Sequence, residues 1–334
     1  MIGHRSAPDQ EQSAGAGTDG GDPVRPSRQR GWPCYHPAAA GQRRLTMRPP
    51  NALHFDAHGD RRNPPVLFLH GITGSRRYWG NKVRPLAANY LLVLPDLIGF
   101  GLSPKPHVDY TIELYRDSVR SLIEELDLAD RPLAIIGHSL GGLIALEYAA
   151  RYRPQVSRMA LLSIPRYTDP VTAHARFWKG SPHYRRLLNE HSLAETLAQM
   201  KRSGMEITLR YLFRFPWPVL IDSHKFTFRS LTSTLESCLL DYQVDRILPA
   251  VPPVPTLLIH GELDSVAPLE HVVPLPDAYP QMRLVTKRGT GHHLFLTHSR
   301  WCMRQITDFL SEGEAEGTAA TRNPLSTRHD QEQR

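Results

Sequence analysis

The sequence feature that most constrains how this chain can fold is a predicted strand, sharp turn and helix within residues 133–151. Leu133 to Ile136 is a short apolar run, as expected for a strand that is buried on both faces. Before the helical pattern of Leu140 to Arg151 stands Gly-His-Ser-Leu-Gly at residues 137–141, which fits G-x-S-x-G. Glycines two residues before and two after Ser139 let the backbone crowd through the turn and lift the serine hydroxyl clear of the sheet. The segment therefore predicts a nucleophilic serine at a strand end.

The same alternation of short apolar runs and helical patterns extends over residues 52–310. Apolar runs, most of them bounded by Gly, Pro or Asp, predict buried strands at residues 66–70, 91–95, 133–136, 159–164, 256–260 and 283–286. An earlier strand at 52–57, turning at residues 58–60, is expected to form a hairpin with the next strand. Helical periodicity appears at residues 111–126, 140–151 and 300–310. These repeated units predict an α/β fold in which helices cover both faces of a mostly parallel sheet.

The alternation stops between residues 166 and 248. This stretch separates the two parts of the predicted core, residues 49–165 and 249–310. This stretch has no convincing buried strand, but it contains helical segments rich in arginine and aromatic residues, at residues 184–189, 193–202 and 232–247. An insertion of this kind between two core strands predicts a helical cap, residues 166–248. We expect the cap to cover the carboxyl edge of the sheet, where open α/β sheets bind ligands.

Both ends of the chain differ in composition from the core. Residues 1–48 have low hydrophobicity, clustered Gly, Pro and Arg, and no periodicity, so we expect a disordered tail. Met47 lies just before the first structured-looking residues, and an over-long start assignment is the alternative to a functional tail. Residues 311–334 are similar in composition and are expected to form a second disordered tail.

Charge and cysteine content argue against several classes of protein. The formal net charge is +7, but no block of five like charges occurs, so we expect no nucleic-acid partner. No apolar run approaches the ~20 residues of a membrane-spanning helix. The three cysteines form neither a C-x-x-C pair nor an even set, and the N-terminus has no apolar signal segment. We therefore expect a cytoplasmic protein without a structural metal site.

A serine hydroxyl is a poor nucleophile unless a base takes its proton and an acid orients that base. Both partners are available at later strand ends. Gly-Glu-Leu-Asp at residues 261–264 directly follows the predicted strand at 256–260, and Gly-Thr-Gly-His-His at residues 289–293 follows the strand at 283–286. The candidates therefore occur along the chain in the order Ser139, acid, histidine.

With these motifs in this order, the chain resembles the α/β-hydrolase fold family, in its capped esterase and C–C hydrolase branch, over residues 52–310. Besides the G-x-S-x-G turn, the resemblance includes His-Gly at residues 70–71 and Asp-Leu-Ile-Gly-Phe-Gly-Leu-Ser at residues 96–103, each after a predicted strand. It implies a sheet of the eight-stranded type and a helical cap. We expect His70 to brace the loop that follows it by hydrogen bonds, not to catalyse.

The resemblance also implies roles for particular residues. Ser139 corresponds to the nucleophile, Asp264 to the acid and His292 to the base. The backbone N–H groups of Ile72 and Leu140 correspond to an oxyanion hole, since these residues follow the His-Gly pair and the nucleophile.

The acid and the base each have alternatives. The Gly-His pairing of the family favours His292 over the adjacent His293. Spacing favours Asp264 over Glu262, and over Asp169, which lies shortly after an earlier predicted strand.

The predicted chemistry follows from the serine. Haloalkane dehalogenases and epoxide hydrolases of the family use Asp at this turn, so both activities are disfavoured. The leading hypothesis is a carboxylic-ester hydrolase that acts on a small or medium hydrophobic substrate through an acyl-enzyme, with no metal or organic cofactor. The alternatives are a C–C bond or lactone hydrolase and, from a different class, a ligand sensor with slow turnover. The cap contains aromatic side chains that could line an apolar pocket: Phe177, Trp178, Tyr211, Phe213, Phe215 and Trp217. The sequence leaves the substrate itself and the oligomeric state open.

Overall fold

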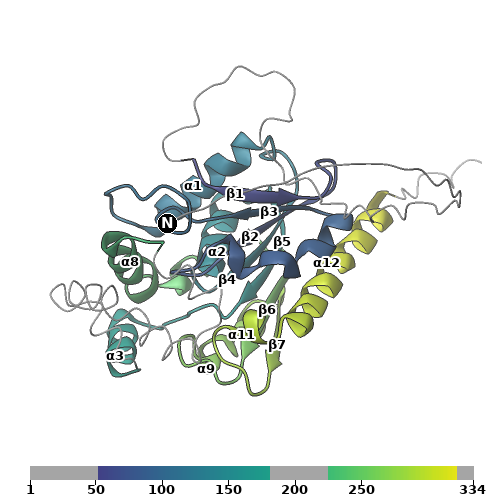
Figure 1. Ribbon diagram of the computed structural model, residues 1–334. Helices are drawn as coiled ribbons and strands as arrows, with labels where there is room; N and C mark the ends of the chain where they lie inside the picture. Colours follow the sequence, from purple (N-terminus) through teal and green to yellow (C-terminus); the bar gives the residue numbers. More distant parts are fainter. Residues whose placement is uncertain (1–51, 181–224, 322–334) are drawn as a thin grey trace, which may run out of the picture. The chain divides into compact units, whose positions relative to one another are not determined.

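The computed structural model describes residues 52–180 and 225–321, which all belong to the unit of the chain that covers residues 34–334. These residues form a seven-stranded sheet in the order β1-β3-β2-β4-β5-β6-β7 (Figure 1). The strands are β1 (Phe55–His58), β2 (Pro65–Leu69), β3 (Leu91–Pro95), β4 (Leu133–His138), β5 (Val156–Leu162), β6 (Thr256–Gly261) and β7 (Met282–Lys287). Strand β1 runs antiparallel to β3, and the other neighbouring pairs are parallel. The mostly parallel sheet is confirmed, with seven strands in the described residues where the resemblance implied the eight-stranded type.

The first strand is paired differently from the prediction. Strand β1 forms its ladder with β3, so the hairpin expected between β1 and the next strand is wrong. All five residues of β2 are buried and need a partner on each side, which β3 and β4 supply. The residues of β1 are half-buried, as suits an edge strand.

The helices of the described residues follow the predicted segments closely in the core. They are α1 (Ile112–Glu125), α2 (Leu140–Arg151), α3 (Pro170–Gly180), α8 (Phe228–Thr234), α9 (Leu269–Val272), α10 (Leu275–Ala278), α11 (Leu294–Thr297) and α12 (Ser299–Thr321). Short 3₁₀ turns are η2 (Arg76–Tyr78), η3 (Gly80–Lys82), η4 (Arg84–Ala88), η6 (Val244–Arg246) and η7 (Leu248–Ala250), and η5 (Leu235–Leu240) is a π-helical turn. None of the helices in the described ranges is long and apolar enough to cross a bilayer.

The two predicted tails have different outcomes. Helix α12 continues past Leu310 to Thr321, so the prediction of a disordered tail is wrong for residues 311–321, whose backbone is helical. The continuation contains Glu and Ala, which favour helix, and no proline to end it. Residues 322–334 and the tail predicted over residues 1–48 lie outside the described residues.

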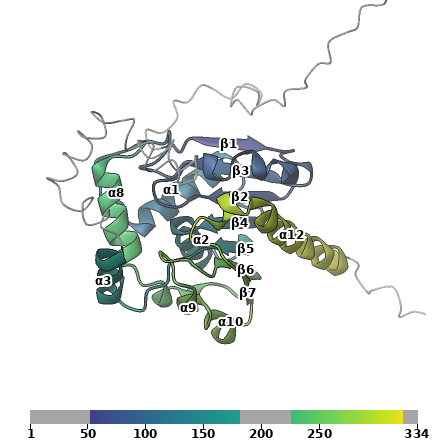
Figure 2. The ribbon, with the colours of Figure 1, turned by 60° about the horizontal axis from the view of Figure 1, so that its bottom comes forward.

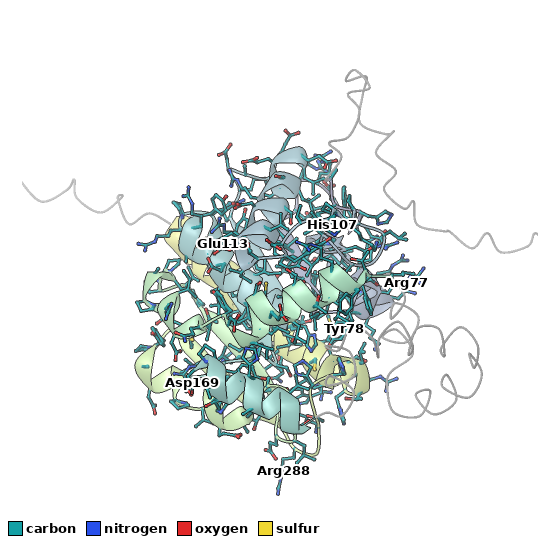
Figure 3. All side chains as sticks on the ribbon, turned by 90° about the vertical axis from the view of Figure 1, so that its left-hand side faces the viewer. Arg77, Tyr78, His107, Glu113, Asp169 and Arg288 are labelled. Atoms are coloured by element: carbon teal, nitrogen blue, oxygen red, sulfur yellow. The ribbon has the colours of Figure 1, made fainter. Side chains whose placement is uncertain are left out.

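Parts of the predicted cap lie on either side of residues 181–224, which are outside the described residues, as are the helices expected at 184–189 and 193–202. Helix α3 precedes this gap and α8 follows it (Figures 1 and 2), and α3 packs against η5, the turn that continues α8. Figure 3 shows Asp169 at the start of α3. The expected helix at 232–247 is instead the end of α8 followed by η5 and η6.

Arg166, which lies before the gap, bonds to residues of η6 and α9, which follow the gap. Arg166 forms a bidentate ion pair with Asp245, with Nε 2.6 Å from Oδ1 and a terminal nitrogen 3.1 Å from Oδ2. The same guanidinium donates a 2.5 Å hydrogen bond to the carbonyl oxygen of His271. Residues on both sides of the gap are therefore joined at their base.

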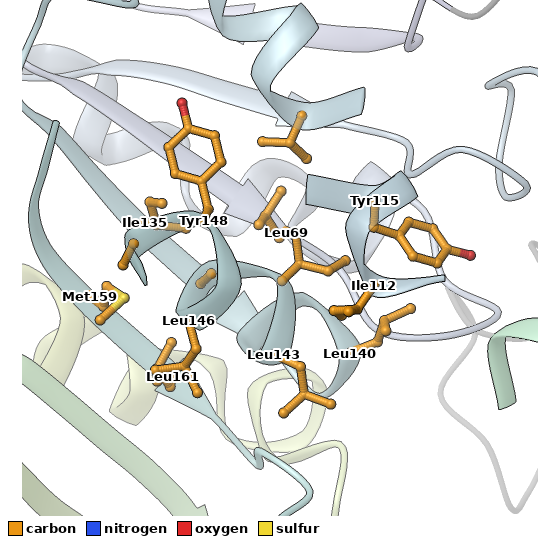
Figure 4. Close-up of a cluster of buried hydrophobic side chains, with 14 of the residues drawn as sticks. Leu69, Ile112, Tyr115, Ile135, Leu140, Leu143, Leu146, Tyr148, Met159 and Leu161 are labelled. Carbon is orange, nitrogen blue, oxygen red and sulfur yellow. The ribbon is translucent and has the colours of Figure 1, made fainter. Parts of the chain in front are cut away.

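The core has two layers because successive side chains of a strand face opposite sides of the sheet. Leu67 and Leu69 of β2 pack in a cluster with α1 and α2, whereas Val66 and Phe68 pack in a second cluster with η2, η4 and α12. Figure 4 shows the first cluster, with side chains of α2 gathered between α1 and the strands β4 and β5. The prediction that helices cover both faces is confirmed.

Candidate active site

Ser139 occupies the turn between β4 and α2, in a backbone conformation that residues other than glycine rarely adopt. Its φ is 52° and its ψ is −118°. A Cβ atom at Gly137 would overlap the carbonyl of Gly141, and one at Gly141 would overlap the carbonyl oxygen of Leu69. The Ser139 N–H donates to the carbonyl oxygen of Leu162 on β5 at 2.9 Å. Close packing of backbone on backbone therefore holds the serine at the carboxyl end of the sheet.

The structure brings together the three side chains that the resemblance selected. His292 Nε2 lies 3.1 Å from Ser139 Oγ. His292 Nδ1 lies 2.9 Å and 3.1 Å from the two carboxylate oxygens of Asp264. Because a carboxylate only accepts, Nδ1 carries the proton and Nε2 is left to accept the serine hydroxyl hydrogen. This geometry equips Ser139 for deprotonation by His292.

Asp264 is held as a buried carboxylate by the turn that follows β6. Its Oδ1 accepts hydrogen bonds from the N–H groups of Val266 and Ala267 at 3.0 Å and 2.8 Å. Burial by itself raises the pKa of Asp264, but hydrogen bonds from His292 and Ala267 and the nearby imidazoles outweigh it and hold the pKa below its ordinary value. Asp264 therefore remains charged, as an acid that orients an imidazole must.

His260 is a supporting residue that the sequence interpretation missed. It is buried and is the last residue but one of β6, and its Nε2 donates a 2.6 Å hydrogen bond to the carbonyl oxygen of Ala267. The same nitrogen lies 3.6 Å from Asp264 Oδ2. His260 thereby closes the turn that carries the acid. The available signal was a polar residue at the end of an apolar strand.

The residues that the sequence offered as alternatives to Asp264 and His292 make other contacts. Within the described residues no hydrogen bond joins His293 to Ser139, and burial lowers the pKa of His293 to about 3. Glu262 is exposed and lies beside Arg288, with 3.9 Å between Oε2 and the arginine Nε. Asp169 accepts hydrogen bonds from the N–H and hydroxyl of Thr172 in the first turn of α3, at 2.7 Å and 2.6 Å. These contacts make Asp169 a helix cap.

The loop after β2 lies directly against Ser139. A Cβ atom built on Gly71 would be 3.2 Å from Ser139 Cβ, so Gly71 lies close against the serine. His70 is buried, and its Nε2 accepts the Leu97 N–H at 2.9 Å. Its Nδ1 therefore carries the proton and donates to the Gly71 carbonyl oxygen at 2.8 Å. Both ring nitrogens brace this loop, in agreement with the expectation for His70.

Asp96 is a second support that the sequence interpretation did not identify. Its fully buried carboxylate accepts hydrogen bonds from the N–H and guanidinium of Arg76 at 2.7 Å and 2.8 Å. It also accepts the Leu102 N–H at 2.7 Å. Gly101, with φ +55°, leaves no room for a side chain against this carboxylate. Asp96 thus ties the loop after β3 to the start of η2, which follows the loop at Gly71.

No group of three histidine, cysteine or carboxylate side chains placed to hold a metal ion occurs in residues 52–180 and 225–321 as far as their side chains are described. Cys238 and Cys302 are buried free thiols in the core.

Several known proteins are similar to this chain over most of its length. Lipase 1 of Psychrobacter immobilis is 27% identical over 260 residues, covering 74% of this chain and 77% of the lipase. The 2-hydroxymuconate semialdehyde hydrolase of a Pseudomonas strain is 25% identical over 261 residues, covering 75% of this chain and 88% of that enzyme. The solved structure of an esterase from Thermogutta terrifontis superposes with a TM-score of 0.61 at 22% identity, covering 78% of this chain and 93% of the esterase. This last likeness shows the fold.

Two family models match the part of the chain that builds the sheet and the candidate site. The model of the alpha/beta hydrolase fold matches residues 64–189, which include the loop at Gly71 and the turn at Ser139. A model described as TAP-like protein matches residues 241–321, which include Asp264 and His292. Together with the sheet topology, these matches show that the chain has the α/β-hydrolase fold.

Proposed function

We propose that this protein is a serine hydrolase that cleaves a carboxylic ester of a small or medium hydrophobic substrate through an acyl-enzyme. The observation that carries the proposal is the continuous hydrogen-bonded array from Ser139 through His292 to Asp264. Such an array turns an ordinary alcohol into a nucleophile at neutral pH. The names of the lipase and the esterase among the similar proteins support the ester as substrate.

The first half-reaction forms the acyl-enzyme. His292 Nε2 removes the hydroxyl proton as Ser139 Oγ attacks the ester carbonyl carbon, and Asp264 stabilises the imidazolium that results. His292 then returns this proton to the departing alcohol as the carbon–oxygen bond of the ester breaks. In the second half-reaction His292 takes a proton from a water molecule as the water oxygen attacks the acyl carbon. The bond from that carbon to Ser139 Oγ then breaks, His292 returns the proton to Oγ, and the carboxylic acid leaves.

The negative charge that develops on the carbonyl oxygen needs donors in a fixed position. We assign these donors to the N–H groups of Ile72 and Leu140. Leu140 is the first residue of α2, where N–H groups have no partner within the helix and the helix dipole favours negative charge. Ile72 follows Gly71, which lies against Ser139. Each donor contributes roughly 3 to 4 kcal/mol to stabilisation of the transition state.

The remainder of the proposal concerns substrate access and location. We assign residues 166–248 to a helical cap whose apolar side chains select the substrate, since this stretch contains α3 and α8 and its two ends are joined by the ion pair of Arg166 with Asp245. A cytoplasmic location remains a prediction from cysteine usage.

A C–C bond or lactone hydrolase is the second candidate. The similarity to 2-hydroxymuconate semialdehyde hydrolase extends over 75% of this chain, about as far as the similarity to the lipase. The same triad can serve either reaction, because both begin with deprotonation of Ser139 or of a water by His292. Comparing turnover of a nitrophenyl ester, a lactone and a vinylogous diketo acid distinguishes these candidates.

The decisive test of the proposed function compares Ser139→Ala with a matched serine variant. Ser163 is suited to the control because it follows β5, is buried and also has a positive φ of 50°. We expect Ser139→Ala to lower kcat on p-nitrophenyl butyrate by about 10⁴-fold or more and to abolish labelling by a fluorophosphonate. Ser163→Ala should retain both. Undiminished turnover or labelling in Ser139→Ala would contradict the proposal. Slow turnover by the wild-type protein, together with stabilisation of its fold by a ligand, would favour a ligand sensor.

A further inference from the structure

His138 lies between the nucleophile and the base, and the mechanism above does not use it. It is the last residue of β4, directly before Ser139, and only 2% of its surface is exposed. A buried imidazole ordinarily finds its hydrogen-bond partners within the protein. Among the described residues Nδ1 of His138 has no such partner, so the partner of Nε2 indicates what this residue does.

The Nε2 atom of His138 contacts the main chain of the base. It lies 3.0 Å from the carbonyl oxygen of His292. Because a carbonyl oxygen only accepts, Nε2 carries the hydrogen and donates it. Two consecutive residues, His138 at the end of β4 and Ser139 after it, therefore both contact His292, one at its backbone and the other at its side chain.

The ring of His138 is itself held in place. It stacks on Tyr78 of η2, with ring centroids 4.4 Å apart and planes inclined by 20°. On another side, a Cβ atom built on Gly71 would lie only 2.8 Å from His138 Nδ1, so the loop after β2 packs directly on the ring. Tyr78 and Gly71 leave the imidazole little freedom, which makes it a rigid donor.

We propose that His138 is a positioning residue for the base: its Nε2–H holds the carbonyl of His292 and thereby sets the distance from the His292 imidazole to Ser139 Oγ. The inference rests on the proposed function, since it assumes that His292 acts as the base. His292 lies in the loop between β7 and α11, outside any helix or strand, so its backbone needs such an anchor. An ångström of displacement at a base can cost about 10²-fold in rate.

The electrostatic surroundings keep His138 suited to this task. Burial first, and then the imidazoles of His292, His293 and His70, lower the pKa of His138 well below its ordinary value, although the hydrogen bond to the His292 carbonyl opposes this. Tyr78 adds a neutral phenol to the cluster. His138 therefore remains neutral when His292 takes the serine proton, and it adds no competing charge.

Three variants of His138 separate the role of the N–H donor from that of the bulk of the side chain. His138→Phe keeps a ring to stack on Tyr78 but has no N–H. His138→Gln places an amide nitrogen the same number of bonds from Cα as Nε2 of histidine. His138→Asn carries the same amide one bond short of that position. We expect kcat on p-nitrophenyl butyrate to fall by about ten- to hundredfold in the Phe and Asn variants, with KM within about twofold, and to recover in Gln to within about threefold of wild type.

Only variants whose melting temperature lies within a few degrees of that of wild type are compared. If His138→Phe destabilises the fold, the comparison of Gln with Asn decides alone, because both carry an amide. Wild-type kcat in the Phe and Asn variants would overturn the proposal. Equal loss in Gln and Asn would do so as well, because the donor would then be irrelevant.

A second readout keeps this test separate from the test of the ester hydrolase. The proton between His292 Nδ1 and Asp264 gives a low-field proton NMR signal that requires no substrate. We expect this signal in wild type and His138→Gln, and its broadening or shift in His138→Phe. If wild type does not hydrolyse the ester, the proposed function fails and the NMR signal alone decides on His138. An identical signal in all three proteins would then refute the role.

Discussion

The turn that carries Ser139, the proposed nucleophile, and the turns that carry the proposed acid and base, Asp264 and His292, are built in different ways. Around Ser139, backbone packs directly on backbone, and Gly137 and Gly141 have no room for a side chain. The acid turn is packed in this way only at its start, where a Cβ atom at Gly261 would overlap the carbonyl oxygen of Thr290. Beyond Gly261 it is held by hydrogen bonds, with Asp264 and the carbonyl oxygen of Ala267 as acceptors. A Cβ atom at Gly291 would make only an ordinary contact of 3.4 Å.

This difference teaches that packing and polar contacts do separate tasks in one site. Close packing holds Ser139 in a strained conformation, which persists only where the surroundings force it. Hydrogen bonds set the protonation and the direction of the imidazole. The acid and base turns also bond to each other, because the Leu263 N–H donates to the Thr290 carbonyl oxygen at 2.8 Å. Changes in the first turn should therefore affect stability most, and changes in the others should affect rate most.

The largest expected effect is on the rate and comes from the acid turn. Asp264→Asn keeps the shape of the side chain but removes the charge that stabilises the His292 imidazolium, so kcat on p-nitrophenyl butyrate should fall by about 10⁴-fold. Glu262→Gln, two residues away and exposed, should stay within about twofold of wild type. Steady-state kinetics of both variants provide the check. A large loss in Glu262→Gln with little loss in Asp264→Asn would assign the acid to Glu262.

The second effect is on stability and comes from the nucleophile turn. Gly141→Ala forces a methyl group into the carbonyl of Leu69, and the free energy of unfolding should fall by about 3 kcal/mol. Gly291→Ala, beside His292, has room for its methyl group and should cost less than about 1 kcal/mol. Urea unfolding of the two variants measures this contrast. Equal losses would break the distinction between the packed turn and the bonded turns.

The smallest effect is a pH dependence of stability. The pKa of Asp264 is lowered in the folded protein, so its carboxylate contributes stability above the unfolded pKa of about 3.9, and this contribution is lost as pH falls through the folded pKa. The difference in unfolding free energy between wild type and Asp264→Asn should therefore narrow below about pH 4. Urea unfolding between neutral and acidic pH measures it. Parallel curves over that range would show that Asp264 is not held as a carboxylate by its partners.

Much of the fold could be predicted because its signals are local. The strand before Ser139 and the helix after it appear where the apolar run and the helical pattern placed them. The hairpin failed because β1 and β2 are neighbours along the chain, while the choice of β3 as the partner of β1 depends on the whole sheet. The end of α12 was misplaced because composition favoured a tail where good helix formers continue the helix.

Within the candidate site, the residue types that carry chemistry were visible in the sequence and their supports were not. Ser139, Asp264 and His292 each stand at a strand end beside a recognisable motif. His138 and Asp96 stand within recognised motifs, but no pattern indicated that they or His260 support the site, because each acts through a hydrogen bond to a distant segment or to a loop. The bond from His138 to His292, for example, spans 154 positions of the chain.

The sequence by itself determined the order of strands and helices along the core and the set of side chains able to attack, accept a proton or orient a base, since these follow from periodicity and from motifs between neighbours. Only the tertiary structure decided that His292 and not His293 faces Ser139, that β1 pairs with β3, and that Asp169 caps a helix. The physical reason is that hydrogen bonds and close packing act over a few ångströms in space, and the chain brings remote residues within that range only when it has folded.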